Sequence, residues 1–216
     1  MTDSLPHTLL SASSAIVADA LDALGLRDQV LNTRIKGVFA GARMVGRAYP
    51  VSVVTDSAMP SHPYAGEMQA LSAMSAGDVG VYGVQGQTLA AAWGELFSCA
   101  AIGRGVAGVL VDGCIRDTQQ IGQLNFPVFA SGTSPLDTLA RARVDSHGIS
   151  VLCGDMHVVR GDVIVADGDG VVVIPSGKVA EVAAFIAHKH RLEQAAKDDL
   201  LAGMAIEEVW EKYGVF

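Results

Sequence analysis

Cysteine and charge are both scarce in this chain, and each scarcity excludes a class of protein. The three cysteines, Cys99, Cys114 and Cys153, are odd in number and show no C-x-x-C spacing. A disulfide framework or a structural zinc site is therefore not expected, and a reducing compartment fits. Only 18% of the 216 residues are charged while 50% are hydrophobic, so we expect a sizeable core rather than disorder.

The chain also lacks a basic excess and a long apolar run. Its formal net charge of −8 argues against nucleic acid as a partner, although a single arginine is enough to bind a small anion. No uninterrupted run of about 18 apolar residues occurs, so we expect no membrane span. Residues 1–7 show neither the basic nor the apolar region of a signal peptide, which favours a cytoplasmic location.

Strand and helix signals alternate at first, and later strands follow one another through tight turns. This pattern predicts an α/β layered sandwich with a mixed sheet rather than a wholly parallel one. We expect a core domain over residues 1–175 and a C-terminal helical extension over 176–216 that packs on the core or on a neighbouring subunit. Helices are predicted at 11–24, 67–75, 95–104, 118–124, 176–201 and 205–213. Strands are predicted at 48–55, 79–82, 106–111, 127–130, 151–159, 163–166 and 171–174.

Three predicted helix ends carry specific signals. Ser13 or Ser14 is expected to cap the first helix, and Gly25 to end it in the left-handed conformation. Ser176 is expected to cap the long C-terminal helix, because it directly follows the proline that stops the preceding strand.

The most informative stretch runs from Trp93 to Asp117. Gly94 and Glu95 open a predicted helix, a small-residue linker follows, and an apolar strand then leads to the adjacent pair Arg116-Asp117. Twenty residues separate Glu95 from Arg116, which is enough for one helix and one strand running back beside it. The spacing predicts that two carboxylates and a guanidinium meet at one edge of the sheet. A divalent cation and a small anionic ligand would fit between them.

Arg116 and Asp117 each have a structural interpretation beside the functional one. A guanidinium just past a strand end can bind a carboxylate through two parallel hydrogen bonds, but Arg116 could equally pair with a surface acid. Asp117 could ligate Mg²⁺, which often takes one or two protein carboxylates and several waters. Alternatively, Asp117 and Gln120 could form a capping box for the short helix that follows.

Glu95 and its neighbours are also open to two interpretations. A carboxylate in the first turn of a helix favours the positive end of the helix dipole, which requires no ligand. The free backbone N–H groups of Gly94, Glu95, Leu96 and Phe97 could instead bind a substrate carboxylate, and the Glu95 side chain could then accept hydrogen bonds from metal-bound water.

The pairing of Glu95 with Arg116-Asp117 resembles the (Asp/Glu)-x20-Arg-Asp motif of the class II pyruvate aldolases. These are the 4-hydroxy-4-methyl-2-oxoglutarate/4-carboxy-4-hydroxy-2-oxoadipate aldolases. Their superfamily also includes the regulator of ribonuclease E activity A and members labelled demethylmenaquinone methyltransferase-like. The likeness covers most of the chain and is carried as well by residues 19–21, 104–113, 126–129 and 161–171.

The resemblance implies a fold of the swivelling β/β/α type that assembles as trimers or hexamers, with sites between subunits. Carried over by position, it implies that residues 94–97 offer backbone amides to the ligand and that Arg116 binds its pyruvoyl part. Asp117 would be the direct ligand of Mg²⁺ or Mn²⁺, and Glu95 would hold metal-bound water. Glu193, in the helical tail, would do so in the site of a neighbouring subunit.

The expected activity is divalent-metal-dependent cleavage of a 4-hydroxy-2-oxo acid to pyruvate, with decarboxylation of oxaloacetate through the same enolate. No lysine lies near the motif, so a Schiff base is not expected. The alternative is a non-catalytic protein that regulates a ribonuclease by protein contact, but such relatives tend to be shorter than this chain. A methyltransferase is disfavoured, because the sequence has no glycine-rich loop for adenosylmethionine.

Overall fold

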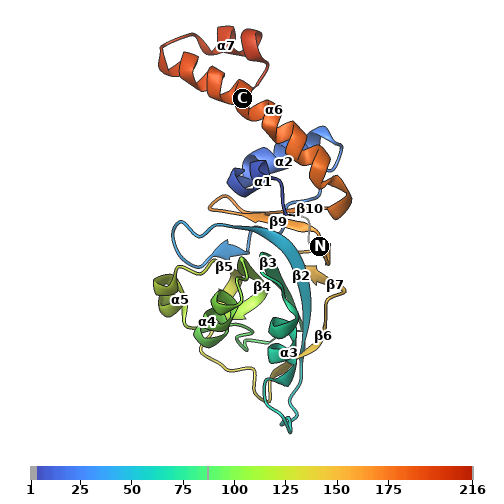
Figure 1. Cartoon of the computed structure of the whole chain (residues 1–216). Helices are drawn as coiled ribbons and strands as arrows, with labels where there is room; N and C mark the ends of the chain where they lie inside the picture. Colours follow the sequence, from blue (N-terminus) through green and yellow to red (C-terminus); the bar gives the residue numbers. More distant parts are fainter. Residues whose placement is uncertain (1–3, 87, 216) are drawn as a thin grey trace.

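The computed structural model describes residues 4–86 and 88–215, which form a mixed eight-stranded sheet, a small hairpin and covering helices (Figure 1). Residues 1–3, 87 and 216 lie outside the described part, and they include the outer ends of both expected units. The helices are α1 (His7–Ser11), α2 (Ser14–Ala23), α3 (Ala65–Ala73), α4 (Glu95–Gly103), α5 (Thr118–Leu124), η1 (Ser176–Lys178), α6 (Val179–Leu201) and α7 (Ile206–Tyr213). The strands are β1 (Lys36–Gly37), β2 (Met44–Thr55), β3 (Asp78–Gln85), β4 (Gly108–Ile115), β5 (Val128–Thr133), β6 (Ala142–His147), β7 (Ser150–Cys153), β8 (Met156–Val159), β9 (Val163–Ala166) and β10 (Val171–Ile174).

The long strand β2 connects the two parts of the main sheet. One side of β2 pairs in parallel with β3, and β4 and β5 continue the parallel part. The other side pairs antiparallel with β9 through residues 44–47 and with β6 through residues 51–55. The strand order is β1-β5-β4-β3-β2-β9-β10, with β6 off this path on β2, so the predicted mixed sheet is confirmed.

Three hydrophobic clusters fill the space around the sheet. Helices α3, α4 and α5 cover one face through the aromatic and aliphatic cluster that contains Trp93. The hairpin of β7 and β8 covers part of the other face through a cluster that contains Leu110 and Phe129. The third cluster joins α1, α2 and the start of α6 to β9 and β10.

Most of the predicted elements are present. Helix α5 and strands β9 and β10 have the predicted bounds. Ser13 caps α2 by accepting the Ile16 N–H at 3.3 Å, and Gly25 follows with a φ of +78°, as predicted. The predicted helix beyond Gly94 is α4.

One predicted strand and one predicted helix cap were wrong. The single strand over 151–159 is the hairpin of β7 and β8, because Gly154 and Asp155 both have positive φ and reverse the chain between them. Ser176 does not cap the long helix, since its backbone N–H donates to Asp162 Oδ1 at 3.0 Å and η1 intervenes before α6. Strand β6 was not predicted.

Strand β4 continues past the predicted end of the apolar run. Its register against β5 shifts between Val111 and Cys114, so Asp112 and Gly113 form a β-bulge and pairing resumes at Cys114. Bulges redirect the side chains that follow them. The bulge therefore separates Asp112, on the hairpin side of the sheet, from the Arg116-Asp117 pair that follows the strand.

The C-terminal helices form an arm that projects away from the sheet (Figure 1). The first half of α6 buries Val182, Ala183 and Ile186 against α1, α2 and the adjoining strands. Lys189 pairs with Asp19 of α2 at 2.6 Å, so this half of the arm shares a core with the N-terminal helices. None of the described helices combines the length and apolar character required to cross a membrane.

Candidate functional site

The start of α4 lies beside the end of β4 because the chain just before α4 is hydrogen-bonded along that strand. Ala91 forms an isolated parallel bridge with Cys114, and the Ala92 N–H donates to the Cys114 carbonyl at 2.9 Å. The Arg116 N–H in turn donates to the Trp93 carbonyl at 3.0 Å. These bonds bring Glu95, Arg116 and Asp117 together, in the arrangement that the twenty-residue spacing suggested.

The buried Trp93 fixes the start of α4. Its indole Nε1–H donates to Ser98 Oγ at 2.8 Å, and the Ser98 hydroxyl donates to the Gly94 carbonyl at 3.0 Å. The indole packs edge-on against Tyr82, with ring centroids 5.4 Å apart, and it also contacts Phe97 at 5.6 Å. Buried aromatic contacts of this kind hold the first turn of α4 in one position.

Asp117 precedes α5, but its side chain caps α4. Its φ is 59° and its carboxylate makes no capping bond to α5, so the capping box with Gln120 was a wrong interpretation. The left-handed backbone points the side chain away from α5, and Oδ2 accepts the Glu95 N–H at 3.1 Å. One of the four amides expected to bind a ligand is therefore already bonded to Asp117. The next two N–H groups, of Leu96 and Phe97, are bonded to no residue in the described part of the chain.

Gly94 permits this close approach of the two chain segments. A Cβ at position 94 would lie 2.8 Å from Asp117 Oδ2 and 3.2 Å from Arg116 Cγ. The backbone of Gly94 is extended, with φ −164° and ψ −170°, so its conformation alone does not require glycine. The requirement is one of space, because any side chain would displace the Asp117 carboxylate.

Arg116 is held from two sides and remains partly exposed. Its Nη1 pairs with Asp137 Oδ2 at 2.7 Å, and its Nε lies 3.6 Å from Asp117 Oδ2. The arginine side chain keeps 39% of its surface exposed, which leaves an edge of the guanidinium open to an anion. The predicted pairing with an acid and the predicted anchor role are therefore compatible.

Asp137 receives several hydrogen bonds in addition to the Arg116 ion pair. Burial alone would raise the pKa of this carboxyl, but bonds from the Leu139 N–H, the Tyr64 hydroxyl and Arg116 outweigh burial and lower the pKa below its usual value. The Tyr64 hydroxyl donates to Oδ1 at 3.0 Å and the Leu139 N–H at 2.7 Å. Asp137 is therefore an ionised partner that holds Arg116 in place.

Glu67, from the first turn of α3, lies next to this group. Burial raises the pKa of its carboxyl, bonds from its own N–H and from the Thr138 side chain partly oppose this, and the charge of Asp137 raises the pKa further. Glu67 and Thr138 are only 9% and 6% exposed. The site thus contains two adjacent carboxyls in contrasting environments, with Asp137 held ionised and Glu67 biased toward its neutral form.

All these groups border one cavity of about 750 Å³. Its wall includes Arg116, Asp117 and Glu95 together with Tyr64, Glu67, Asp137 and Thr138. Apolar side chains complete the wall, and they come from α3 and α4: Met68, Leu71, Leu96, Phe97 and Ala100. The cavity therefore combines two arginines, Arg104 and Arg116, with several carboxyls and an apolar wall.

The donor chemistry of the cavity fits a hard divalent cation held by one carboxylate. Among the described residues no three His, Cys, Asp or Glu side chains are arranged to hold a metal together. Asp117 Oδ1 is bonded to no described residue, and Asp117 and Glu95 both line the cavity, which suits Mg²⁺ with its retained waters. Glu193 does not border the cavity of its own chain, and it lies 3.4 Å from Lys189 on the projecting arm.

The sequence reasoning missed Tyr64, Glu67, Asp137 and Thr138. Asp137 and Tyr64 are 73 positions apart, and no spacing rule connects residues that meet only through the tertiary fold. A usable signal existed in the acid at the start of a predicted helix, since Glu67 occupies the same kind of position as Glu95.

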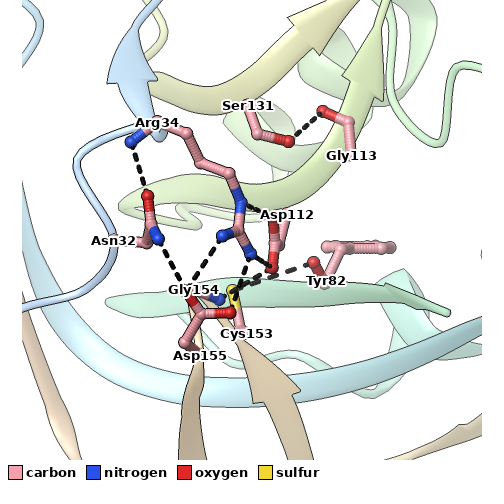
Figure 2. Close-up of polar contacts among 9 residues, drawn as sticks. All are labelled: Asn32, Arg34, Tyr82, Asp112, Gly113, Ser131, Cys153, Gly154 and Asp155. Atoms are coloured by element: carbon pink, nitrogen blue, oxygen red, sulfur yellow. Dashed lines mark hydrogen bonds and ion pairs between the residues drawn. The ribbon is translucent and has the colours of Figure 1, made fainter.

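A second polar cluster lies on the hairpin side of the sheet (Figure 2). Arg34 donates to both carboxylate oxygens of Asp112, at 3.0 and 2.7 Å, and also contacts Asp155 at 3.0 Å. Asp112 Oδ2 also accepts the Gly154 N–H at 2.8 Å. These bonds fasten the turn of the β7–β8 hairpin to the bulge of β4, so this cluster is a structural one.

The fold and this cavity define an RraA-like protein. The family described as RraA-like, Aldolase/RraA, matches residues 14–173, and the chain belongs to it.

Individual relatives agree with this assignment. A protein of Halalkalibacterium halodurans named "Putative 4-hydroxy-4-methyl-2-oxoglutarate aldolase" is 31% identical over 91% of this chain and 89% of its own length. Protein DlpA of Legionella pneumophila is 27% identical over 98% of this chain, which spans only 34% of DlpA. The structure of Streptomyces coelicolor RraAS2, described as an unusual member of the RNase ES inhibitor RraA protein family, is similar with a TM-score of 0.76. Its sequence identity is 26%, over 88% of this chain and 93% of RraAS2.

Proposed function

We propose that the protein cleaves a 4-hydroxy-2-oxo acid to pyruvate in a reaction that depends on a divalent metal ion. The observation that carries the proposal is the adjacency of the Arg116 guanidinium and the Asp117 carboxylate, 3.6 Å apart on the wall of one cavity. The name of the Halalkalibacterium halodurans relative supports the same substrate class.

Arg116 is the group that binds the substrate carboxylate. Asp137 holds its Nη1 at 2.7 Å, so the remaining N–H donors are directed before the substrate arrives. The free N–H groups of Leu96 and Phe97 lie at the positive end of α4 and stabilise the same negative charge. The three groups together orient a 2-oxo acid with its carboxylate toward the start of α4.

Glu95 is the group that we assign to the proton of the C4 hydroxyl. Its carboxylate borders the cavity and accepts that proton through a water molecule, after which the C3–C4 bond breaks and the pyruvate enolate forms. Asp117 would hold Mg²⁺ or Mn²⁺, which supplies Lewis-acid stabilisation of negative charge when bound. Arg116 adds electrostatic stabilisation at the same oxygen atoms, which is the largest contribution in many reactions of this kind.

The enolate also connects the proposal to a second activity. Decarboxylation of oxaloacetate yields the same pyruvate enolate, so we expect one site to catalyse both reactions. The assembly that goes with this function is a homotrimer or homohexamer, in which Glu193 of the arm would approach the cavity of a neighbouring subunit.

The test is pyruvate release from oxaloacetate, followed by a screen of 4-hydroxy-2-oxo acids. We expect release with Mg²⁺, loss of release with a chelator, and at least about a 100-fold loss in Arg116→Ala. Arg27→Ala, an exposed arginine far along the chain from the cavity residues, is the matched control and should retain full activity. Release no faster than with the metal alone would contradict the proposal and favour a protein that regulates a ribonuclease by contact.

A further inference from the structure

Glu67 is a buried carboxyl on the cavity wall, and none of the steps proposed above involves it. We propose that Glu67 is the acid that delivers a proton to C3 of the pyruvate enolate. The inference rests on the proposed function and assigns the step that follows carbon–carbon cleavage.

The position of Glu67 is fixed from both sides. Gly66 packs so closely against β6 that a Cβ at this position would lie 2.9 Å from Val144 Cβ, so the first turn of α3 lies directly against that strand. On the cavity side the carboxyl is hydrogen-bonded to the Thr138 side chain. A carboxyl held in this way points to one place, as proton transfer to a carbon atom requires.

The charges around Glu67 favour its protonated form. The charge of Asp137 acts on Glu67, and Asp137 is kept ionised by the Leu139 N–H, the Tyr64 hydroxyl and Arg116. The buried Tyr82 hydroxyl interacts with Glu67 from the sheet below it. Burial and the Asp137 charge raise the pKa of Glu67, so this carboxyl carries a proton that it can donate.

The contacts also connect this acid to the group that binds the substrate carboxylate. Arg116 Nη1 binds Asp137 at 2.7 Å, and the next residue, Thr138, is bonded to Glu67. The anchor for the substrate carboxylate and the proposed acid are therefore linked through two successive residues of one loop. A short 2-oxo acid held by its carboxylate at Arg116 extends across the cavity that both groups border.

The proposed step is balanced in atoms and electrons. The electron pair of the enolate C2–C3 double bond forms the new C3–H bond with the proton of Glu67, and the C2 carbonyl is restored. Glu67 becomes a carboxylate. The proton released earlier from the C4 hydroxyl then reaches Glu67 through water and restores its acid form. No oxidant or further reactant is needed. In the reverse direction, the Glu67 carboxylate removes a methyl proton from bound pyruvate.

This reverse step gives the experiment. Wild-type protein with Mg²⁺ and pyruvate in D₂O should exchange the methyl protons of pyruvate, which proton NMR follows directly. Glu67→Gln should lose exchange by about 100-fold or more, the size expected when a positioned acid–base group is removed. Calorimetry should show that pyruvate binding changes less than about twofold, because the anchor at Arg116 is intact. Glu207→Gln, on the exposed face of α7, is the matched control and should exchange at the wild-type rate.

A second variant separates a catalytic role from a structural one. Glu67→Asp keeps an acid but shortens it by one methylene, so it should restore part of the exchange that Glu67→Gln loses. Exchange at the wild-type rate in folded Glu67→Gln would overturn the inference and leave the proposed function standing. A wild-type protein that neither releases pyruvate from oxaloacetate nor exchanges its methyl protons would overturn the proposed function itself.

Discussion

The carboxylate of Asp117 accepts a hydrogen bond from the backbone N–H of Glu95 at 3.1 Å. A residue that follows β4 and precedes α5 thereby fixes the first turn of α4. The same carboxylate lies 3.6 Å from Arg116 Nε, so one oxygen atom links the helix start, the cation and the proposed metal ligand. A substitution at Glu95, Arg116 or Asp117 should therefore alter the geometry of the other two residues.

The space at position 94 provides the first prediction. Gly94→Ala should reduce pyruvate release by about 10- to 100-fold, because the new methyl group displaces the Asp117 carboxylate by several tenths of an ångström. Thermal unfolding should change little, since the extended backbone of Gly94 suits alanine. Gly103→Ala, with nothing within 4 Å of its added Cβ, should retain full activity. Equal activity in both variants would show that the contact at position 94 is unimportant.

The Arg116–Asp137 ion pair provides the second prediction. Asp137→Asn should raise the KM for oxaloacetate by about tenfold, because the amide no longer holds the guanidinium in position. The exposed turn residue Asp169 offers a control, and Asp169→Asn should leave KM unchanged. An unchanged KM in Asp137→Asn would exclude a positioning role for this acid.

The contribution of the Arg116–Asp137 ion pair to the free energy of unfolding should depend on pH in a defined direction. The pKa of Asp137 is lowered in the folded protein, so its contribution to stability is fully present above the unfolded value of about 4. The contribution is lost as the pH falls through the folded pKa. The stability advantage of the wild type over Asp137→Asn in urea unfolding should therefore shrink below pH of about 4, and a constant difference would contradict this prediction.

Glu67 should show the opposite dependence. Burial, reinforced by the charge of Asp137, raises its pKa, so ionisation of this carboxyl opposes folding. The wild type should lose stability relative to Glu67→Gln as the pH rises from the unfolded value, about 4.3, through the raised folded pKa. Thermal unfolding of both proteins from pH 4 to 8 measures this difference. A difference that grows toward low pH would refute the assignment of Glu67 as a carboxyl biased toward its neutral form.

The cluster around Arg34 should matter for stability rather than for chemistry. Arg34→Ala leaves the Asp112 carboxylate, only 16% exposed, without its two-point partner, and we expect a loss of about 1–3 kcal/mol in the free energy of unfolding. Arg143 pairs with two acids at a more exposed position, and Arg143→Ala should lower the free energy of unfolding by less than Arg34→Ala does. Urea unfolding compares the two variants, and equal losses would remove the distinction between these ion pairs.

The sequence predicted those parts of the site whose contacts are local or follow from one helix and one strand. The return from Glu95 to Arg116 needs only the length of α4 and β4, and both were recognisable from apolar residues and glycines. The direction of the Asp117 side chain was not predictable, because it depends on a φ of 59° that no sequence motif indicates.

The remaining wall of the cavity was not predictable for a different reason. Glu67 and Thr138 meet because α3 lies against β6, and the strand signal in β6, where apolar Ala142 and Val144 alternate with Arg143 and Asp145, was overlooked. The hairpin turn was missed similarly, although Gly154-Asp155 between two apolar runs is a hairpin signal. Contacts between distant segments appear only once the sheet order is known.

The residues of this chain that line the cavity come from its middle, from residue 64 to residue 138, whereas α1, α2, α6 and α7 lie beyond β9 and β10 (Figure 1). A label attached near α1 or α2 would thus lie beyond β9 and β10, away from the cavity of the same chain. Protein immobilised through such a label should therefore keep this cavity open to small molecules.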